Sequence, residues 1–314
     1  MRVGRRHKRT TRPLNPPDLD RERFMSTPSR RRAIFLDVDG TLMQDGRYLP
    51  PSAVDAVRTA RENGHLVFLS TGRGMKELVG PILDIGFDGA VTNGGGFGSI
   101  GDEVVVAELL TPAAVAHLEE RFLAHGVHWY FQTFDRMFAS PELPALMQRY
   151  VERDRRAHDD RQALLGEGEK AEEFFSVGMK EFDPDELFAA GDAVKAVILS
   201  DDADAVAAVV AELDGAFAVV GGTIPLPVGS SGEVSAAGVN KGATILRLLD
   251  RLGIDPADAI GVGDNWNDVE MFEICGTSIA MGNAAPAVQA LADQVTTAID
   301  DHGIRNAFVR NGLI

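Results

Sequence analysis

The chain has 314 residues, of which 45% are hydrophobic and 25% are charged, as in ordinary globular proteins. No stretch approaches 18 consecutive apolar residues, so no transmembrane helix and no membrane partner are expected. The formal net charge is −16, and because residues 1 to 32 carry about +8, the remainder carries −24. An acidic body of this kind argues against nucleic acid as the main partner.

Residues 1–31 form a basic leader that is rich in Arg and Pro. It has no periodic apolar face, so we expect it to be disordered. It also lacks the apolar centre of a secretory signal. Two alternatives stay open, namely that Met25 is the true start, or that the leader is a basic arm that binds nucleic acid.

Beyond the leader, short apolar runs alternate with amphipathic stretches. Strands are expected at 33–38, 66–69 and 89–92, and a helix is expected to begin at Pro51 and to end at Gly64. Apolar runs separated by helices are typical of a parallel sheet that is covered on both faces.

The middle of the chain, residues 96–235, has a different pattern and is expected to be an inserted α+β domain. Strands are expected at 104–106, 127–131, 194–199 and 216–220, with helices at 112–125 and 203–213. The charged segment 152–173 is expected to be a solvated helix or loop.

The first pattern then returns, with helices expected at 240–252, 268–274 and 285–292 and strands at 259–263 and 277–281. The expected fold class is therefore α/β, with a doubly wound parallel sheet split into 32–95 and 236–314 around the insertion. The single cysteine, Cys275, cannot form an intrachain disulfide, which favours a reducing compartment, and we expect a cytoplasmic location.

The strongest local feature is a pair of carboxylates, Asp37 and Asp39, at the end of the first apolar run. Ligands bind at the carboxyl ends of strands in open α/β sheets. A spacing of two residues places both side chains on one side of an extended chain, and close carboxylates suit Mg²⁺. The alternative is a plain turn, because Gly40 follows directly.

A second acidic group follows the later strand, where Asp264 precedes Asn267 and Asp268. Asp264 is a candidate metal ligand. Asp268 would lie in the first turn of a helix, where the helix dipole favours acids, so helix capping is an equal alternative for it.

Ser70, Thr71, Gly72 and Arg73 follow the second strand. A hydroxyl and free backbone N–H groups at such a junction form an anion site. The alternative is that Thr71 caps a helix.

Lys241 stands at an expected helix start, where the helix dipole disfavours a cation. The chain has only six Lys, and none follows Lys241. Because the dipole disfavours a Lys at this position, its placement is better explained by an anion that it binds. A plain surface Lys is the alternative.

Taken together, these four residue sets resemble the motifs of the haloacid dehalogenase superfamily of phosphatases, in the same order. The resemblance to the Cof-type branch, subfamily IIB with a C2-type cap, extends to further segments: 69–73, 92–94, 239–242, 267–272 and 280–284. It covers nearly everything from Arg32 onward. It implies a Rossmann-like core, and the 169 residues between Thr71 and Lys241 leave room for a large α/β cap that sets substrate choice.

The resemblance also implies roles for individual residues. Asp37 would be the nucleophile and Asp39 the general acid and base. Mg²⁺ would be held by Asp37, the backbone carbonyl of Asp39, Asp264 and Asp268. The residues expected on the phosphate or substrate side are Thr71, Gly72, Arg73, Asn93, Lys241 and Asn267.

The sequence therefore predicts a Mg²⁺-dependent phosphatase acting on a small phosphorylated metabolite, such as a sugar phosphate or a phosphorylated cofactor. A phosphomutase and a catalytically silent binding protein are the alternatives. Trp266 departs from the branch as a large residue at the rim of the site, and the charged segment 152–170 matches no known pattern.

Overall fold

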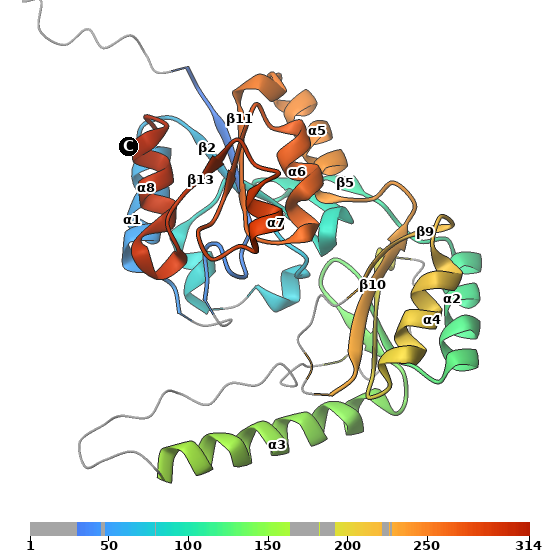
Figure 1. Ribbon diagram of the computed structural model, residues 1–314. Helices are drawn as coiled ribbons and strands as arrows, with labels where there is room; N and C mark the ends of the chain where they lie inside the picture. Colours follow the sequence, from blue (N-terminus) through green and yellow to red (C-terminus); the bar gives the residue numbers. More distant parts are fainter. Residues whose placement is uncertain are drawn as a thin grey trace, which may run out of the picture. The chain divides into compact units, whose positions relative to one another are not determined.

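The structure is a computed structural model, and it describes residues 30–44, 48–78, 80–163, 182, 192–221, 226 and 228–314 (Figure 1). Residues Arg31–Ile314 form one compact unit. The expectations for the basic leader, including its disorder and a start at Met25, fall outside the described residues.

The larger sheet has eight strands in the described residues, in the order β13-β12-β11-β1-β2-β3-β4-β5. All neighbours pair in parallel except β4, which is antiparallel to both β3 and β5. The expected α/β class with a parallel core is confirmed. The strands are β1 (Ala33–Leu36), β2 (Leu66–Ser70), β3 (Gly89–Thr92), β4 (Phe97–Ile100), β5 (Glu103–Ala107), β11 (Ala259–Gly263), β12 (Thr277–Ala280) and β13 (Gln294–Val295).

Helices cover both faces of this sheet (Figure 1). One apolar cluster joins Ile34 and Leu36 to α1 and α8, and the other joins Ala33 and Phe35 to α5, α6 and α7. Every residue of β1 is thus buried, which explains its unbroken apolar run. The helices are α1 (Pro51–Glu62), α5 (Lys241–Leu252), α6 (Val269–Ile274), α7 (Pro286–Gln289) and α8 (Gly303–Arg310).

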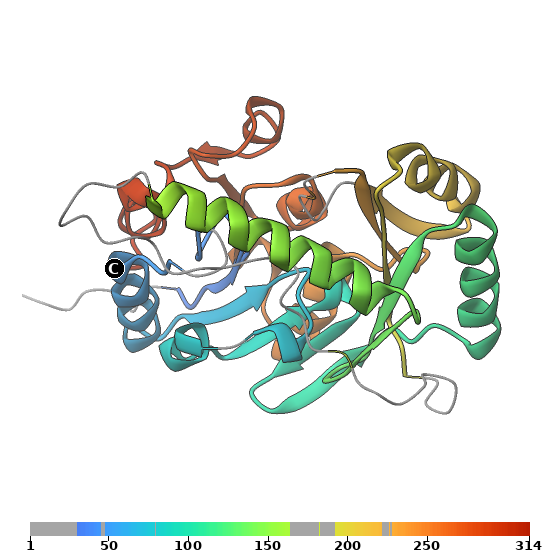
Figure 2. The same ribbon diagram turned by 90° about the horizontal axis from the view of Figure 1, so that it is seen from below.

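The smaller sheet has the order β7-β6-β8-β10-β9 and is antiparallel throughout. Helices α2 and α4 lie side by side against one face, and α3 packs on the other (Figure 2). None of the described helices is long and apolar enough to cross a membrane. The elements are α2 (Pro112–His125), β6 (His128–Gln132), β7 (Met137–Ala139), α3 (Leu143–Ala163), β8 (Lys195–Ser200), α4 (Ala203–Leu213), β9 (Phe217–Gly221) and β10 (Ser230–Ala236).

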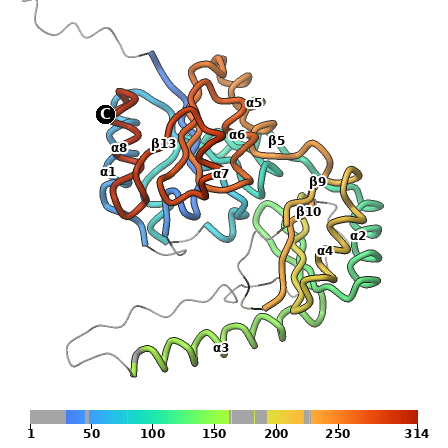
Figure 3. The backbone as a smooth tube through the Cα atoms, viewed as in Figure 1, coloured from blue at the N-terminus to red at the C-terminus, as the bar shows by residue number. Residues whose placement is uncertain are grey.

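The start of the insertion at residue 96 stays a prediction, and the strands that follow this residue bear on it. The chain leaves the larger sheet only after β5 and returns after β10, as Figure 3 shows. Strands β4 and β5 form a hairpin at the edge of the larger sheet, with Gly101 in its turn at φ +55°. Apolar periodicity reveals a strand but not its partner, and we propose a boundary near Glu108.

The structure describes only the first part of the charged segment 152–173. Residues 152–163 continue α3, so the expected helix is found there. Residues 164–173 lie outside the described part of the chain.

Candidate active site

Three strands of the larger sheet end beside one another. In parallel register, β1 lies between β2 and β11, so their carboxyl ends meet at one edge of the sheet. Asp37 follows β1, Thr71 follows β2 and Asp264 follows β11. The backbone N–H of Asp37 still donates to the Val262 carbonyl at 2.9 Å, which fixes its position.

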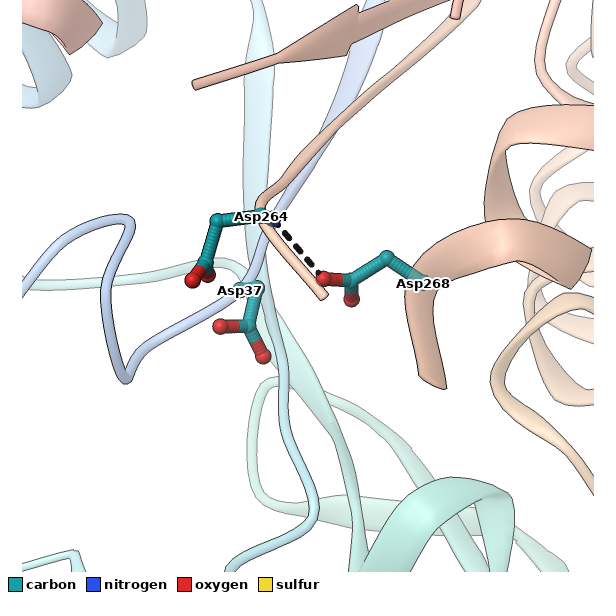
Figure 4. Close-up of side chains that lie close together, drawn as sticks. All are labelled: Asp37, Asp264 and Asp268. Atoms are coloured by element: carbon teal, nitrogen blue, oxygen red, sulfur yellow. Dashed lines mark hydrogen bonds between the residues drawn. The ribbon is translucent and has the colours of Figure 1, made fainter. Parts of the chain in front are cut away.

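Three carboxylates gather at this edge. Asp37, Asp264 and Asp268 each offer an oxygen, and these oxygens lie within 4.8 Å of one another. Figure 4 shows Asp268 pointing from the start of α6 back toward the other two. The N–H groups of Asp264 and Asn265 donate to Asp268 Oδ2 at 3.0 and 3.1 Å, so this carboxylate is held in place.

Lys241 is buried against this cluster. Its Nζ lies 2.6 Å from both Asp37 Oδ1 and Asp268 Oδ1. The alternative of a plain surface Lys is wrong, because the side chain is only 1% exposed. Burial lowers the pKa of Lys241, but the carboxylates of Asp268 and Asp37 more than offset this effect, so the net shift is upward.

The pKa values of two carboxyl groups in the cluster are raised. Burial raises the pKa of Asp37 well above its usual range; Lys241 lowers it, while Asp268 and Asp264 raise it further. Burial and the nearby Asp268 raise the pKa of Asp264 to about 6, although the Thr41 hydroxyl donates to Asp264 Oδ1 at 2.9 Å. Two like charges at close range disfavour the ionised form of each.

This donor set fits a hard divalent cation. When ionised, the three carboxylates share one ammonium, so negative charge is in excess, and carboxylate oxygens are the protein ligands that Mg²⁺ prefers. Gly40 allows the carboxylate of Asp264 to approach the backbone closely, because a Cβ at residue 40 would lie 2.2 Å from Asp264 Oδ2. The backbone of Gly40 has φ +87°, which glycine adopts at little cost.

Asp39 lies outside the cluster, because β1 ends at Leu36 and the chain then turns, with Met43 N donating to Val38 O at 2.7 Å. The expectation that a spacing of two places both carboxylates on one side of an extended chain stays a prediction, because the strand ends before Asp37. Arg73 donates to Asp39 through Nε at 2.8 Å and Nη2 at 2.6 Å. Burial lowers the pKa of Arg73, but its bond to Asp39 helps to raise it overall.

The remaining predicted residues differ in their surroundings. Thr71 is buried, and its Oγ1 accepts from Arg73 N at 3.1 Å. Thr71 caps no helix, because the next helical turn, η1 (Met75–Glu77), begins after Gly74. Asn267 is partly exposed in the short turn η6 (Trp266–Asp268), and Trp266 beside it is 56% exposed.

Asn93 is buried and faces the smaller sheet. Its Nδ2 donates to Gln132 Oε1 at 3.2 Å and to the Thr133 carbonyl at 3.3 Å. Its Oδ1 is buried without a hydrogen bond in the described part of the chain. The backbone N–H of Asn93 donates to the Arg73 carbonyl at 2.8 Å, which joins this residue to the loop after β2.

The sequence argument assigned no role to several residues that support the site. Thr41 donates to Asp264, and Asn283 Nδ2 donates to the Gly40 carbonyl at 2.8 Å. Lys195 donates to the Gly72 carbonyl at 2.6 Å from the smaller sheet. One signal was present for Lys195, since a charged residue stands inside an apolar run.

Comparison with known proteins assigns the chain to a family. The family model for haloacid dehalogenase-like hydrolases matches residues 34–308. The chain belongs to the haloacid dehalogenase-like hydrolases. This membership confirms the family expected from the motifs.

Several known proteins are similar to this chain over nearly their whole length. YkrA of Bacillus subtilis, provisionally named a phosphatase, is 29% identical over 90% of this chain and 98% of its own. A phosphoglycolate phosphatase of Methanothermobacter thermautotrophicus is 26% identical over 89% and 98%. A 5-amino-6-(5-phospho-D-ribitylamino)uracil phosphatase of Bacillus subtilis, YwtE, is 25% identical over 87% and 95%. These names agree with the expected enzyme class, a phosphoric monoester hydrolase, which is thereby confirmed.

Solved structures show the same fold. A hypothetical protein from Geobacillus kaustophilus has a TM-score of 0.69 and 26% identity, covering 90% of this chain and all of its own. The subclass IIB sugar phosphatase BT4131 has a TM-score of 0.68 and 22% identity, covering 90% and 100%. This haloacid dehalogenase-like hydrolase therefore shares the fold with an inserted cap, and we call residues 108–236 the cap.

Proposed function

We propose that this hydrolase is a Mg²⁺-dependent phosphatase that forms an aspartyl-phosphate on Asp37 and acts on a small phosphorylated metabolite. The observation that carries the proposal is the contact of Asp37 with Lys241 at 2.6 Å inside a cluster of three carboxylates. This contact supports the proposal, because transfer of a phosphoryl group requires a nucleophilic carboxylate beside a fixed cation and a set of metal-binding oxygens.

Asp37, Asp264 and Asp268 would hold the Mg²⁺, together with the backbone carbonyl of Asp39. When bound, the cation would offset the negative charge of the phosphoryl oxygens and of the carboxylates. The three carboxylates fit this role because their oxygens lie within 4.8 Å of one another.

In the first half of the reaction, an oxygen of Asp37 forms a bond to phosphorus while the bond from phosphorus to the leaving oxygen breaks. A proton from Asp39 goes to that leaving oxygen. Lys241 stabilises the charge on the phosphoryl oxygens, and Thr71, Gly72 and Asn267 complete the phosphate site.

In the second half, a water oxygen attacks phosphorus and the bond to Asp37 breaks. Asp39 accepts the proton of that water, so the enzyme returns to its starting state. Arg73 donates one N–H to each oxygen of Asp39, and each oxygen keeps a lone pair that can exchange a proton.

The substrate is proposed to be a sugar phosphate or a phosphorylated cofactor. Two of the relatives support a small substrate, since they are named for phosphoglycolate and for 5-amino-6-(5-phospho-D-ribitylamino)uracil. Arg73 and Asn93, between the metal cluster and the cap, are the proposed contacts to the rest of the substrate. Cys275 is a buried free thiol, and the cytoplasmic location stays a prediction.

The test is release of inorganic phosphate from para-nitrophenyl phosphate and from a panel of phosphorylated metabolites, with and without Mg²⁺. We expect Mg²⁺-dependent release that Asp37→Asn abolishes. Product analysis must show dephosphorylated metabolite. Isomerised sugar phosphate without free phosphate would indicate a mutase, and no turnover with any divalent metal would indicate a binding protein.

A further inference from the structure

The cap contacts the loop that carries Arg73 through two buried side chains. Lys195, at the start of β8, donates to the Gly72 carbonyl at 2.6 Å. Gln132, at the end of β6, donates to Glu77 Oε2 at 2.5 Å. These two residues face each other across neighbouring strands, so they form one polar end of the cap sheet.

Lys195 is held firmly in this position. Its side chain is 3% exposed, and its Nζ also lies 3.0 Å from Glu233 Oε2 on β10. A buried ammonium has to satisfy its charge and its donors, and a carboxylate and a carbonyl do so here. The bond to Gly72 is therefore a fixed feature of the structure.

The glycines of the loop also lie close to polar side chains. A Cβ on Gly72 would lie 3.5 Å from Glu233 Oε1, and one on Gly74 would lie 3.1 Å from Asn93 Nδ2. Little space remains for the loop to move toward the cap while these contacts last.

The same loop holds the carboxylate of Asp39. Arg73 stands between the two glycines, its carbonyl accepts from Asn93 N at 2.8 Å, and its guanidinium donates to Asp39. Nη1 of Arg73 also donates to the Glu77 carbonyl at 3.2 Å, so both ends of the loop orient this guanidinium.

We propose that Lys195 and Gln132 are positioning residues for the reaction: they hold the loop 71–77 from the cap side, and through Arg73 they orient Asp39 toward the leaving oxygen. The cap thereby contributes to proton transfer as well as to covering the substrate. This role rests on the proposed function, because it needs Asp39 to act as the acid.

The test compares two aryl phosphates of similar size that differ in leaving group. Phenyl phosphate needs a proton on its leaving oxygen, whose pKa is about 10 as in tyrosine, whereas para-nitrophenyl phosphate needs little help. In Lys195→Met we expect kcat/KM to fall about 10- to 100-fold for phenyl phosphate. For para-nitrophenyl phosphate we expect kcat/KM to fall less than about 3-fold, because departure of its leaving group hardly depends on an acid.

Gln132→Met is the second variant and is expected to show the same selective loss, which keeps the test valid if Lys195→Met fails to fold. Arg121→Met is the matched control, because Arg121 is a cap cation that pairs with Glu212 on the other face of the cap sheet. It should change neither rate.

A double-mutant cycle with Arg73→Met completes the test. If Lys195 acts through Arg73, the double variant is no slower than Arg73→Met alone on phenyl phosphate. Equal losses on both substrates, or losses that multiply in the double variant, would overturn the proposal, as would a lower Tm with an unchanged rate ratio. Failure of the proposed function is distinct, because the wild type would then release no phosphate.

Discussion

Lys241 Nζ donates to Asp37 Oδ1 at 2.6 Å, and both side chains are almost completely buried. The two residues are 204 positions apart in the chain, so the contact depends on the whole parallel sheet being formed. It joins the proposed nucleophile to the only cation within the acidic cluster that the described residues provide.

Replacing this cation should abolish turnover and weaken the fold. Lys241→Met leaves Asp37 and Asp268 buried without their ammonium, which we expect to cost about 3–5 kcal/mol of unfolding free energy in the absence of metal. We also expect kcat to fall by more than about 100-fold, as when one stabilising donor is lost. Urea denaturation and phosphate release measure the two effects.

Arg251→Met serves as the control for this variant. Arg251 lies on the same helix, α5, and its Nη2 is 4.0 Å from Glu103 Oε1 on the surface. Its loss should leave activity unchanged and shift stability by less than about 1 kcal/mol. An active Lys241→Met enzyme would contradict the proposed role of Lys241.

Mg²⁺ should stabilise the protein, and the effect should depend on pH. The raised pKa values of Asp37 and Asp264 mean that the metal-free fold loses stability as pH rises from about 4 through about 6, because the unfolded chain ionises these groups at lower pH. Bound Mg²⁺ offsets this loss at pH 7.5, whereas at pH 5 it has to displace a proton from Asp264.

Thermal unfolding with and without Mg²⁺ at the two pH values checks this prediction. We expect a clear rise in Tm at pH 7.5, a much smaller rise at pH 5, and a reduced rise in Asp264→Asn at pH 7.5. An equal Mg²⁺ effect at both pH values would show that the carboxylates are already ionised without metal.

Gly40→Ala should damage the site more than the fold. The new Cβ would lie 2.2 Å from Asp264 Oδ2, so that carboxylate has to move. A reacting or metal-binding group that is misplaced by about 1 Å costs about 100-fold in rate. Gly101→Ala is the matched control, because Gly101 also has a positive φ, +55°, but has nothing within 4 Å of its Cβ position.

Both glycine variants should lose about 1 kcal/mol or more of stability from backbone strain. Only Gly40→Ala should lose Mg²⁺-dependent phosphate release. If Gly101→Ala loses activity to the same extent, backbone strain rather than contact with Asp264 explains the effect.

His65 should make stability fall at acid pH. Its Nδ1 accepts from Arg32 N at 3.2 Å, and burial, followed by the charge of Arg32, lowers its pKa below 6.5. A lowered pKa means that the neutral ring stabilises the fold above pH 6.5 and that this contribution is lost as pH falls further.

His65→Gln can keep an acceptor for Arg32 N but does not titrate. The stability of the wild type relative to His65→Gln, measured by urea denaturation, should therefore decrease from pH 7.5 to pH 5.5. The acidic cluster is the same in both proteins, so its effect on the pH dependence of stability cancels in the difference between their unfolding free energies. A difference that grows toward pH 5.5 would show that the charged ring is favoured instead.

Much of the site follows from local sequence features. Asp37, Thr71, Lys241 and Asp264 stand at strand ends or at a helix start, and a parallel sheet brings such positions to one edge whatever the side chains between them. The apolar runs and the helical periodicity were also sufficient for most elements, including α2 and α4 at both ends.

Other features are decided by contacts between distant segments. The periodicity of β4 and β5 is the same in either sheet, and only their pairing with β3 places them in the core. Arg73, which follows β2, donates to both carboxylate oxygens of Asp39, which lies in the turn after β1.

The sequence by itself determined the α/β class and the family, because both follow from patterns within the strands and within a few residues of the strand ends. Only the tertiary structure decided that Lys241 is buried between two carboxylates and that Lys195 of the cap holds the loop of Arg73. Lys195 and Gly72 are 123 residues apart in the chain, and Lys241 and Asp37 are 204 residues apart. Their meeting depends on sheet order and on cap docking, which local propensity does not encode.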